Sequence, residues 1–120
     1  MTFTIVAHDP VTRTVGLCQG TSAMGVASRC THVRSGVAAV ASQSHSDWRI
    51  GRRALDLAQS GLDPAAIITA LETTDAHFAF RQVGIVTPDG RVRSEERFSR
   101  NAETADGISY AVFCLKKIFF

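Results

Sequence analysis

The spacing of hydrophobic positions in the first third of the chain predicts β-strands. Residues 2–7 are β-branched, aromatic or small, and both faces of the strand they would form are largely apolar, so an internal strand is expected. An Asp-Pro turn at residues 9–10 predicts a hairpin to a second strand over residues 15–20. The apolar run at residues 36–42 predicts a strand covered on both faces. Residues 21–34 have no clean period and predict mostly a loop.

Two helices are expected in the middle of the chain. Apolar positions recur at helical spacing over residues 48–60, with Asp47 available as N-cap and Gly61 just past the end. Asp63 and Pro64 predict the start of a second helix, since proline suits the first helical position. The short connection between them indicates that the two helices lie side by side on one face of a sheet.

The last third of the chain predicts one more hairpin. Residues 82–86 favour a strand, the turn Thr-Pro-Asp-Gly at residues 87–90 follows, and residues 91–93 begin the return strand. Residues 94–106 are charged without apolar periodicity and predict a solvated connection. Residues 108–120 are apolar again and allow either a last strand or a loosely held terminus.

Composition limits the protein classes to which the chain can belong. With 120 residues, of which 45% are hydrophobic and 20% charged, a single domain over residues 1–120 is expected. A net charge of +2 is too small to dominate binding to a nucleic acid or an anionic membrane, and neither partner is predicted. The chain has no long apolar run and no signal peptide after Met1, so a cytoplasmic protein is expected.

The cysteine and histidine positions do not predict a metal site or a disulfide framework. The three cysteines have apolar or small neighbours, which suits reduced thiols that pack as small hydrophobes. The histidines are scattered singly and no Cys-x-x-Cys pair occurs, whereas a zinc site wants paired ligands at short spacing. Neither a metal nor a cofactor is therefore expected.

Two short motifs look chemical but have simpler explanations. Residues 42–47 hold serine, histidine and aspartate, yet neighbours in sequence seldom meet in the geometry of a catalytic triad, and Asp47 is explained as a helix cap. Residues 20–25 have the glycine spacing of a phosphate-binding loop but lack the lysine and hydroxyl that should follow.

Three arginines open the first expected helix, at positions 49, 52 and 53. Cations at that end oppose the helix dipole unless they have a partner. A solvated charged face is the favoured interpretation of these side chains, and an anion site is the alternative.

Thr2 offers a less ordinary chemistry. If Met1 is removed, the chain starts with a residue that carries both a hydroxyl nucleophile and a free α-amino group. An α-amino group titrates at about 7.7 to 8.0 in model compounds, so it can take the hydroxyl proton and return it to a leaving amine. A strand-forming threonine with no catalytic role is the alternative explanation.

A longer series of motifs follows in register through most of the chain. They are Thr-Phe-Thr-Ile-Val-Ala-His-Asp-Pro at 2–10, Val-Gly at 15–16, Ser-Gly-Val-Ala-Ala-Val-Ala-Ser-Gln at 35–43, Gly-Arg-Arg-Ala-Leu-Asp-Leu at 51–57, Ser-Gly-Leu at 60–62, Asp75, Arg-Gln-Val-Gly-Ile-Val at 81–86 and Asp-Gly-Arg-Val at 89–92. Over residues 2–92 this series resembles the domain of unknown function 1028 family, a branch of the N-terminal nucleophile (Ntn) hydrolases.

The resemblance implies a fold and a set of site residues. It implies an α+β protein, an αββα sandwich of two antiparallel sheets face to face, which is compatible with the strands and helix pair expected above. By the same analogy Thr2 would attack an amide or related acyl bond of a small-molecule or peptide-like substrate, and water would hydrolyse the acyl-enzyme. Ser42, Gln43 and Arg53 would contact that substrate, while Arg81 and Gln82 would anchor the hairpin.

The tail, residues 93–120, departs from the family pattern. After residues 110–112 the family tends to have Gln, Gly and Asn, which look like a source of an oxyanion donor, and this chain does not. A partial sandwich with a helix pair on one face only is therefore expected. Its uncovered face and the apolar end at residues 118–120 would favour a homodimer. The alternative to a hydrolase is a catalytically inactive fragment that acts as a binding or structural module.

Overall fold

The computed structural model describes the backbone of residues 2–96, 102–104 and 110–115, and the side chains of residues 2–95. Its strands are β1 Thr2–His8, β2 Val15–Thr21, β3 Thr31–Arg34, β4 Ala38–Ser44, β5 Arg81–Val86, β6 Val92–Glu96, β7 Ala102–Thr104 and β8 Tyr110–Leu115. Its helices are α1 Ala27–Cys30, α2 Trp48–Gln59 and α3 Pro64–Thr74, with a 3₁₀ turn, η1, at Phe78–Phe80.

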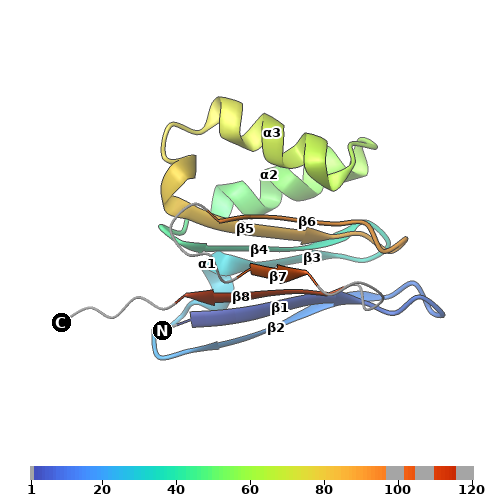
Figure 1. The fold of residues 1–120 in the computed structure, drawn as a ribbon, viewed down its shortest axis with the longest axis horizontal. Coiled ribbons are helices and arrows are strands. Elements are labelled where there is room, and N and C mark those ends of the chain that lie inside the picture. The colour runs from blue at the N-terminus through green and yellow to red at the C-terminus, as the bar shows by residue number, and fades with distance from the viewer. Residues whose placement is uncertain (1, 97–101, 105–109, 116–120) are drawn as a thin grey trace.

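Two sheets lie face to face, with α2 and α3 across the outer face of one of them (Figure 1). We call the sheet of order β2-β1-β8-β7 the N-terminal sheet, and the sheet of order β3-β4-β5-β6 the helix-covered sheet. Every strand pair in the described part of the chain is antiparallel. The architecture confirms the expected α+β class with two antiparallel sheets and a helix pair on one face.

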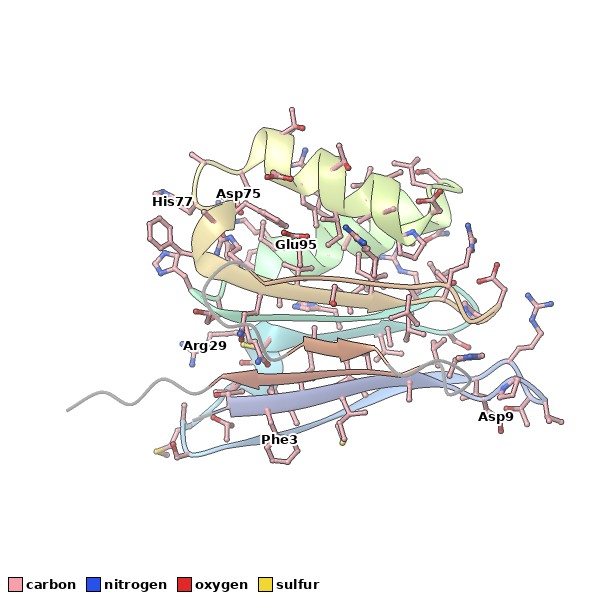
Figure 2. The ribbon with its side chains drawn as sticks, in the orientation of Figure 1. Phe3, Asp9, Arg29, Asp75, His77 and Glu95 are labelled. Carbon is pink, nitrogen blue, oxygen red and sulfur yellow. The ribbon has the colours of Figure 1, made fainter. Side chains whose placement is uncertain are left out.

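Strand β1 is internal, as its apolar faces predict, because it pairs with β2 on one side and β8 on the other. Successive side chains of a strand point to opposite faces. Thr4 and Val6 are fully buried between the sheets, whereas Phe3 is 42% exposed and points away from the sandwich (Figure 2). No described helix covers this outer face of the N-terminal sheet.

Helices α2 and α3 start at the caps that the sequence predicts. The Asp47 carboxylate accepts a hydrogen bond from the Arg49 backbone N–H, and the Asp63 carboxylate accepts one from the Ala66 N–H. The two helices pack side by side on β4 and β5 around a core of eleven buried residues: Ala38, Val40, Ile50, Ala54, Leu55, Ile67, Ile68, Leu71, Phe78, Val83 and Ile85. A smaller apolar cluster between the sheets contains Val6, Val15, Ala39, Ala41 and Val86.

Two sequence-based predictions of loops are wrong. The segment 21–34 contains α1 and the whole of β3, which forms because it pairs along β4 at the edge of the helix-covered sheet. The connection expected at 94–106 contains the end of β6 and all of β7, which pair with β5 and β8. Both errors have one cause, since an edge strand is fixed by its distant partner rather than by its own apolar period.

Candidate functional site

Thr2 begins β1, and its side chain lies on the inner face of the N-terminal sheet, the face shared by Thr4 and Val6. It is directly opposite Thr21 on β2, and Thr2 Oγ1 lies 2.9 Å from Thr21 Oγ1. Thr2 is only partly buried and Thr21 is exposed. A hydroxyl at the first position of an internal strand is thus held by a second hydroxyl while it remains accessible to solvent.

A buried chain of hydrogen bonds crosses from this strand to the other sheet. Thr4 Oγ1 donates to Gln43 Oε1 at 2.5 Å, and Gln43 Nε2 donates to Gln82 Oε1 at 2.9 Å. Gln19 Nε2 donates to Thr4 Oγ1 at 2.9 Å. Thr4, Gln43 and Gln82 are each at most 1% exposed, so these polar groups depend on one another for hydrogen bonds. The network fixes β1 against β4 two residues from Thr2.

Ser42 and Gln43 lie on opposite faces of β4. Gln43 shares its face with Ala39 and Ala41, which pack between the two sheets, whereas Ser42 shares its face with Ala38 and Val40, which pack under the helices. Ser42 is fully buried, and its Oγ has no hydrogen-bond partner among the described residues. Ser42 is therefore separated from Thr2 by the thickness of the helix-covered sheet.

Arg53 also lies on the helix side. It is an exposed residue of α2, which packs on the face of β4 that points away from the N-terminal sheet. Of the sequence-predicted site residues, the fold thus brings Thr2 and Gln43 to the space between the sheets, and Ser42 and Arg53 to the opposite face.

Arg81 joins the loop before α2 to the loop after α3. Its Nε donates to Asp75 Oδ2 at 2.5 Å, its Nη2 donates to Asp75 Oδ1 at 3.3 Å, and its Nη1 donates to the backbone carbonyl of His45. The hydrogen bond from Arg81 lowers the pKa of the Asp75 carboxyl below its ordinary value. Asp75 lies in the turn between α3 and η1 (Figure 2).

Comparison with known proteins shows the family to which the chain belongs. A family model described as "Family of unknown function (DUF1028)" matches residues 2–111. The chain belongs to the DUF1028 family. The match continues past residue 92, the last residue of the motif series, into β8.

A solved structure of similar fold is available for comparison with this DUF1028 chain. It is the crystal structure of protein SPO2555 from Silicibacter pomeroyi, with the family model DUF1028. The TM-score is 0.82 at 21% sequence identity, over 92% of this chain and 50% of that one. The DUF1028 chain therefore spans half the length of this solved relative. No curated protein matches it.

Several residues near Thr2 were not singled out from the DUF1028 sequence. Thr4, Gln19 and Thr21 looked like ordinary strand residues. The pairing of β1 with β2 brings Thr21 beside Thr2 and Gln19 beside Thr4, and the packing of the two sheets brings Thr4 to Gln43. Their one signal was the two-residue period of β1, which puts Thr2 and Thr4 on a common face.

Metal-ligand groups and membrane-spanning helices are absent from the described residues, which do contain two free thiols. They contain no group of three or more histidine, cysteine or acidic side chains that could hold a metal ion. Cys18 and Cys30 are free thiols, and burial raises the pKa of the Cys30 thiol. No described helix is long and apolar enough to span a membrane.

Proposed function

We propose that this protein is an N-terminal nucleophile hydrolase that cleaves an amide or related acyl bond, with Thr2 as the nucleophile. The observation that carries the proposal is the partly exposed Thr2 hydroxyl at the first position of the internal strand β1, within 2.9 Å of Thr21 Oγ1. The ordered motifs that resemble the Ntn hydrolases support it independently of that geometry.

The chemistry needs a free α-amino group on Thr2, and hence removal of Met1. Thr2 Oγ1 attacks the carbonyl carbon while the α-amino group accepts the hydroxyl proton. The carbon–nitrogen bond breaks, and that proton passes to the leaving amine. Water then attacks the carbonyl carbon of the ester on Thr2 Oγ1, and the Thr2 α-amino group takes a proton from this water. The bond between the carbonyl carbon and Oγ1 breaks, and the proton passes to Oγ1. This step releases the acid and restores Thr2.

Neighbouring residues would position the nucleophile rather than react. A hydrogen bond with Thr21 Oγ1 restricts the rotation of the Thr2 hydroxyl. Gln43 is 1% exposed and bonded at both ends of its amide, which supports a positioning role through Thr4. The substrate contacts expected of Ser42, Gln43 and Arg53 stay predictions. A contact from Ser42 or Arg53 to an acyl group on Thr2 would have to cross the helix-covered sheet.

The first experiment is the intact mass of the purified protein, followed by labelling with a β-lactone. A hydroxyl nucleophile opens the ring of a β-lactone and forms an ester that retains every atom of the reagent. The label therefore has no leaving group that would have to match an unknown substrate. We expect a protein without Met1 that gains one reagent mass, a Thr2→Ala variant that gains none, and a Thr12→Ala variant that labels normally. Thr12 is the matched control because it is an exposed threonine in the turn after β1.

Retention of Met1, or labelling that persists in the Thr2→Ala variant, would contradict the proposal. A panel of amides and acyl esters then searches for turnover. Equal rates for the wild type and the Thr2→Ala variant would favour the alternative, an inactive module that binds a partner. The homodimer expected from the sequence also stays a prediction, and sedimentation at high protein concentration tests it.

A further inference from the structure

A pocket lies on the helix side of the molecule, away from Thr2. It is a cavity of about 530 Å³ between the start of α2 and the loop after α3. Its lining is Asp47, Trp48, Arg49, Ile50, Arg52, Arg53, Asp56, Thr74, Asp75, Ala76 and Arg81. Sites for small molecules usually enclose roughly 300 to 1,000 Å³, so this cavity has room for a small ligand.

The charges around the cavity do not cancel within it. Each of its three carboxylates already holds an arginine: Asp47 pairs with Arg49, Asp75 with Arg81, and Asp56 with Arg34. Arg34 does not line the cavity, so Asp56 is paired with an arginine outside it and leaves the arginines of the lining in excess. The hydrogen bond from the Arg49 side chain lowers the pKa of Asp47 to about 2, so this carboxylate stays ionised and keeps Arg49 engaged at neutral pH.

Two lining arginines are not engaged by a carboxylate of the described residues. Among the described residues, neither Arg52 nor Arg53 has a hydrogen-bond or ion-pair partner. A guanidinium group has a flat fork of N–H donors that matches the oxygen pairs of carboxylates and phosphates. Both side chains are exposed, so their guanidinium groups are accessible to an anionic ligand in the cavity.

The cavity wall also contains an exposed aromatic surface. Trp48 is 49% exposed, although tryptophan is mostly buried in folded proteins. The guanidinium carbon of Arg52 lies 5.4 Å from the centre of the Trp48 ring, a cation–π distance. Trp48, Arg52 and Arg53 thus line the same cavity, which offers an aromatic ring beside cationic groups.

We propose that this cavity binds a small planar molecule that carries a carboxylate or phosphate group. The anion pairs with Arg53 and Arg52, and the planar body stacks against the exposed part of Trp48. The site is distinct from the Thr2 region, since the helix-covered sheet separates the two, and it does not depend on the function proposed for Thr2. The proposal takes up the anion site that the sequence offered as the alternative to a solvated face, and the exposure of Arg52 and Arg53 is compatible with both.

The chain contains a single tryptophan, so its fluorescence reports on this cavity directly. The probes are phenyl phosphate and benzoate, which carry the two candidate anions. Inorganic phosphate and phenol serve as comparison compounds, because they are the anionic and the planar part of phenyl phosphate. We expect saturable changes in tryptophan emission with phenyl phosphate or benzoate, at concentrations about tenfold lower than inorganic phosphate or phenol requires. The stronger of the two probes identifies the preferred anion.

An Arg53→Gln variant should weaken binding of the stronger probe about tenfold, because a charge-assisted pair is lost. Arg91→Gln is the matched control, with the same change of charge on an exposed hairpin residue at the other end of β5 and β6. Arg53 has no described partner, so the variant should melt like the wild type in circular dichroism. No saturable signal with either probe, equal binding of phenol, or the same loss in both variants would overturn the proposal.

Discussion

The buried ion pair between Asp75 and Arg81 gives the sharpest test of what holds the helix layer in place. The Arg81 and Asp75 side chains are 4% and 10% exposed, and two hydrogen bonds join them. An Asp75→Asn substitution keeps the shape of the side chain and removes its charge. The Arg81 guanidinium would then be buried opposite a neutral amide.

Removal of one partner from a buried ion pair typically costs about 3 to 5 kcal/mol of folding free energy. We expect the lower end, about 3 kcal/mol, because the Asn oxygen and the His45 carbonyl still accept from Arg81. In a chain of this size, 1 kcal/mol corresponds to roughly 4 °C, so the melting temperature should fall by about 12 °C.

The matched control is Asp56→Asn, which removes the same charge from an exposed pair. Arg34 and Asp56 are 35% and 70% exposed and join α2 to β3. An exposed pair contributes at most about 1 kcal/mol. Urea denaturation followed by circular dichroism measures both variants. If Asp75→Asn loses less than about 1 kcal/mol, or no more than Asp56→Asn, burial is not what makes the Asp75 pair strong.

The pH dependence of the same pair has a defined sign. Arg81 lowers the pKa of Asp75 in the folded protein, so the pair stabilises the fold above the unfolded pKa of about 3.9. That contribution is lost as the pH falls through the folded pKa. The difference in stability between wild type and Asp75→Asn should therefore be constant near neutral pH and shrink below about pH 4.

Four further substitutions, one of them a control, test other parts of the fold. Gln43→Leu should cost about 1 to 3 kcal/mol in urea denaturation, since it leaves buried polar partners unsatisfied. Gly51→Ala should cost about 1 to 3 kcal/mol because the added Cβ would overlap the His32 ring, whereas Gly16→Ala, with open space at that position, should melt like the wild type or slightly higher. Asp47→Ala should cost about 1 kcal/mol because it removes the N-cap of α2, and the circular dichroism melt measures this directly.

Local sequence signals predicted the elements whose formation depends on their own residues. The caps Asp47 and Asp63 start α2 and α3 as predicted, and the turn before residue 91 joins two strands as predicted. Strand β3 was missed because its four residues carry no alternating pattern, and its conformation depends on pairing with residues Ala38–Ala41 of β4. Edge strands of this kind depend on tertiary context that a single sequence does not carry.

The candidate site was predictable only in part, for a similar reason. The Thr2 hydroxyl and its position at a strand start follow from the sequence, and the family match extends over residues 2–111. Its neighbour Thr21 lies nineteen positions away, and only the register between β1 and β2 brings the two hydroxyls together. The register of the two strands depends on the whole hairpin, so the residues around Thr2 or Thr21 do not predict the contact between their hydroxyls.

The separation of Ser42 from Gln43 follows from the geometry of a strand. Neighbouring residues on a strand point to opposite faces, so two consecutive members of one motif cannot both face Thr2. The sequence contained this constraint, but it did not say which face would meet the N-terminal sheet. The consequence is that the helix-covered sheet has two chemically different sides, one with the Thr2 region and one with the arginine-lined cavity. A Thr2→Ala variant should therefore bind the anionic probes normally, and an Arg53→Gln variant should react with a β-lactone normally. A loss of both properties in either variant would mean that the two sides are not independent.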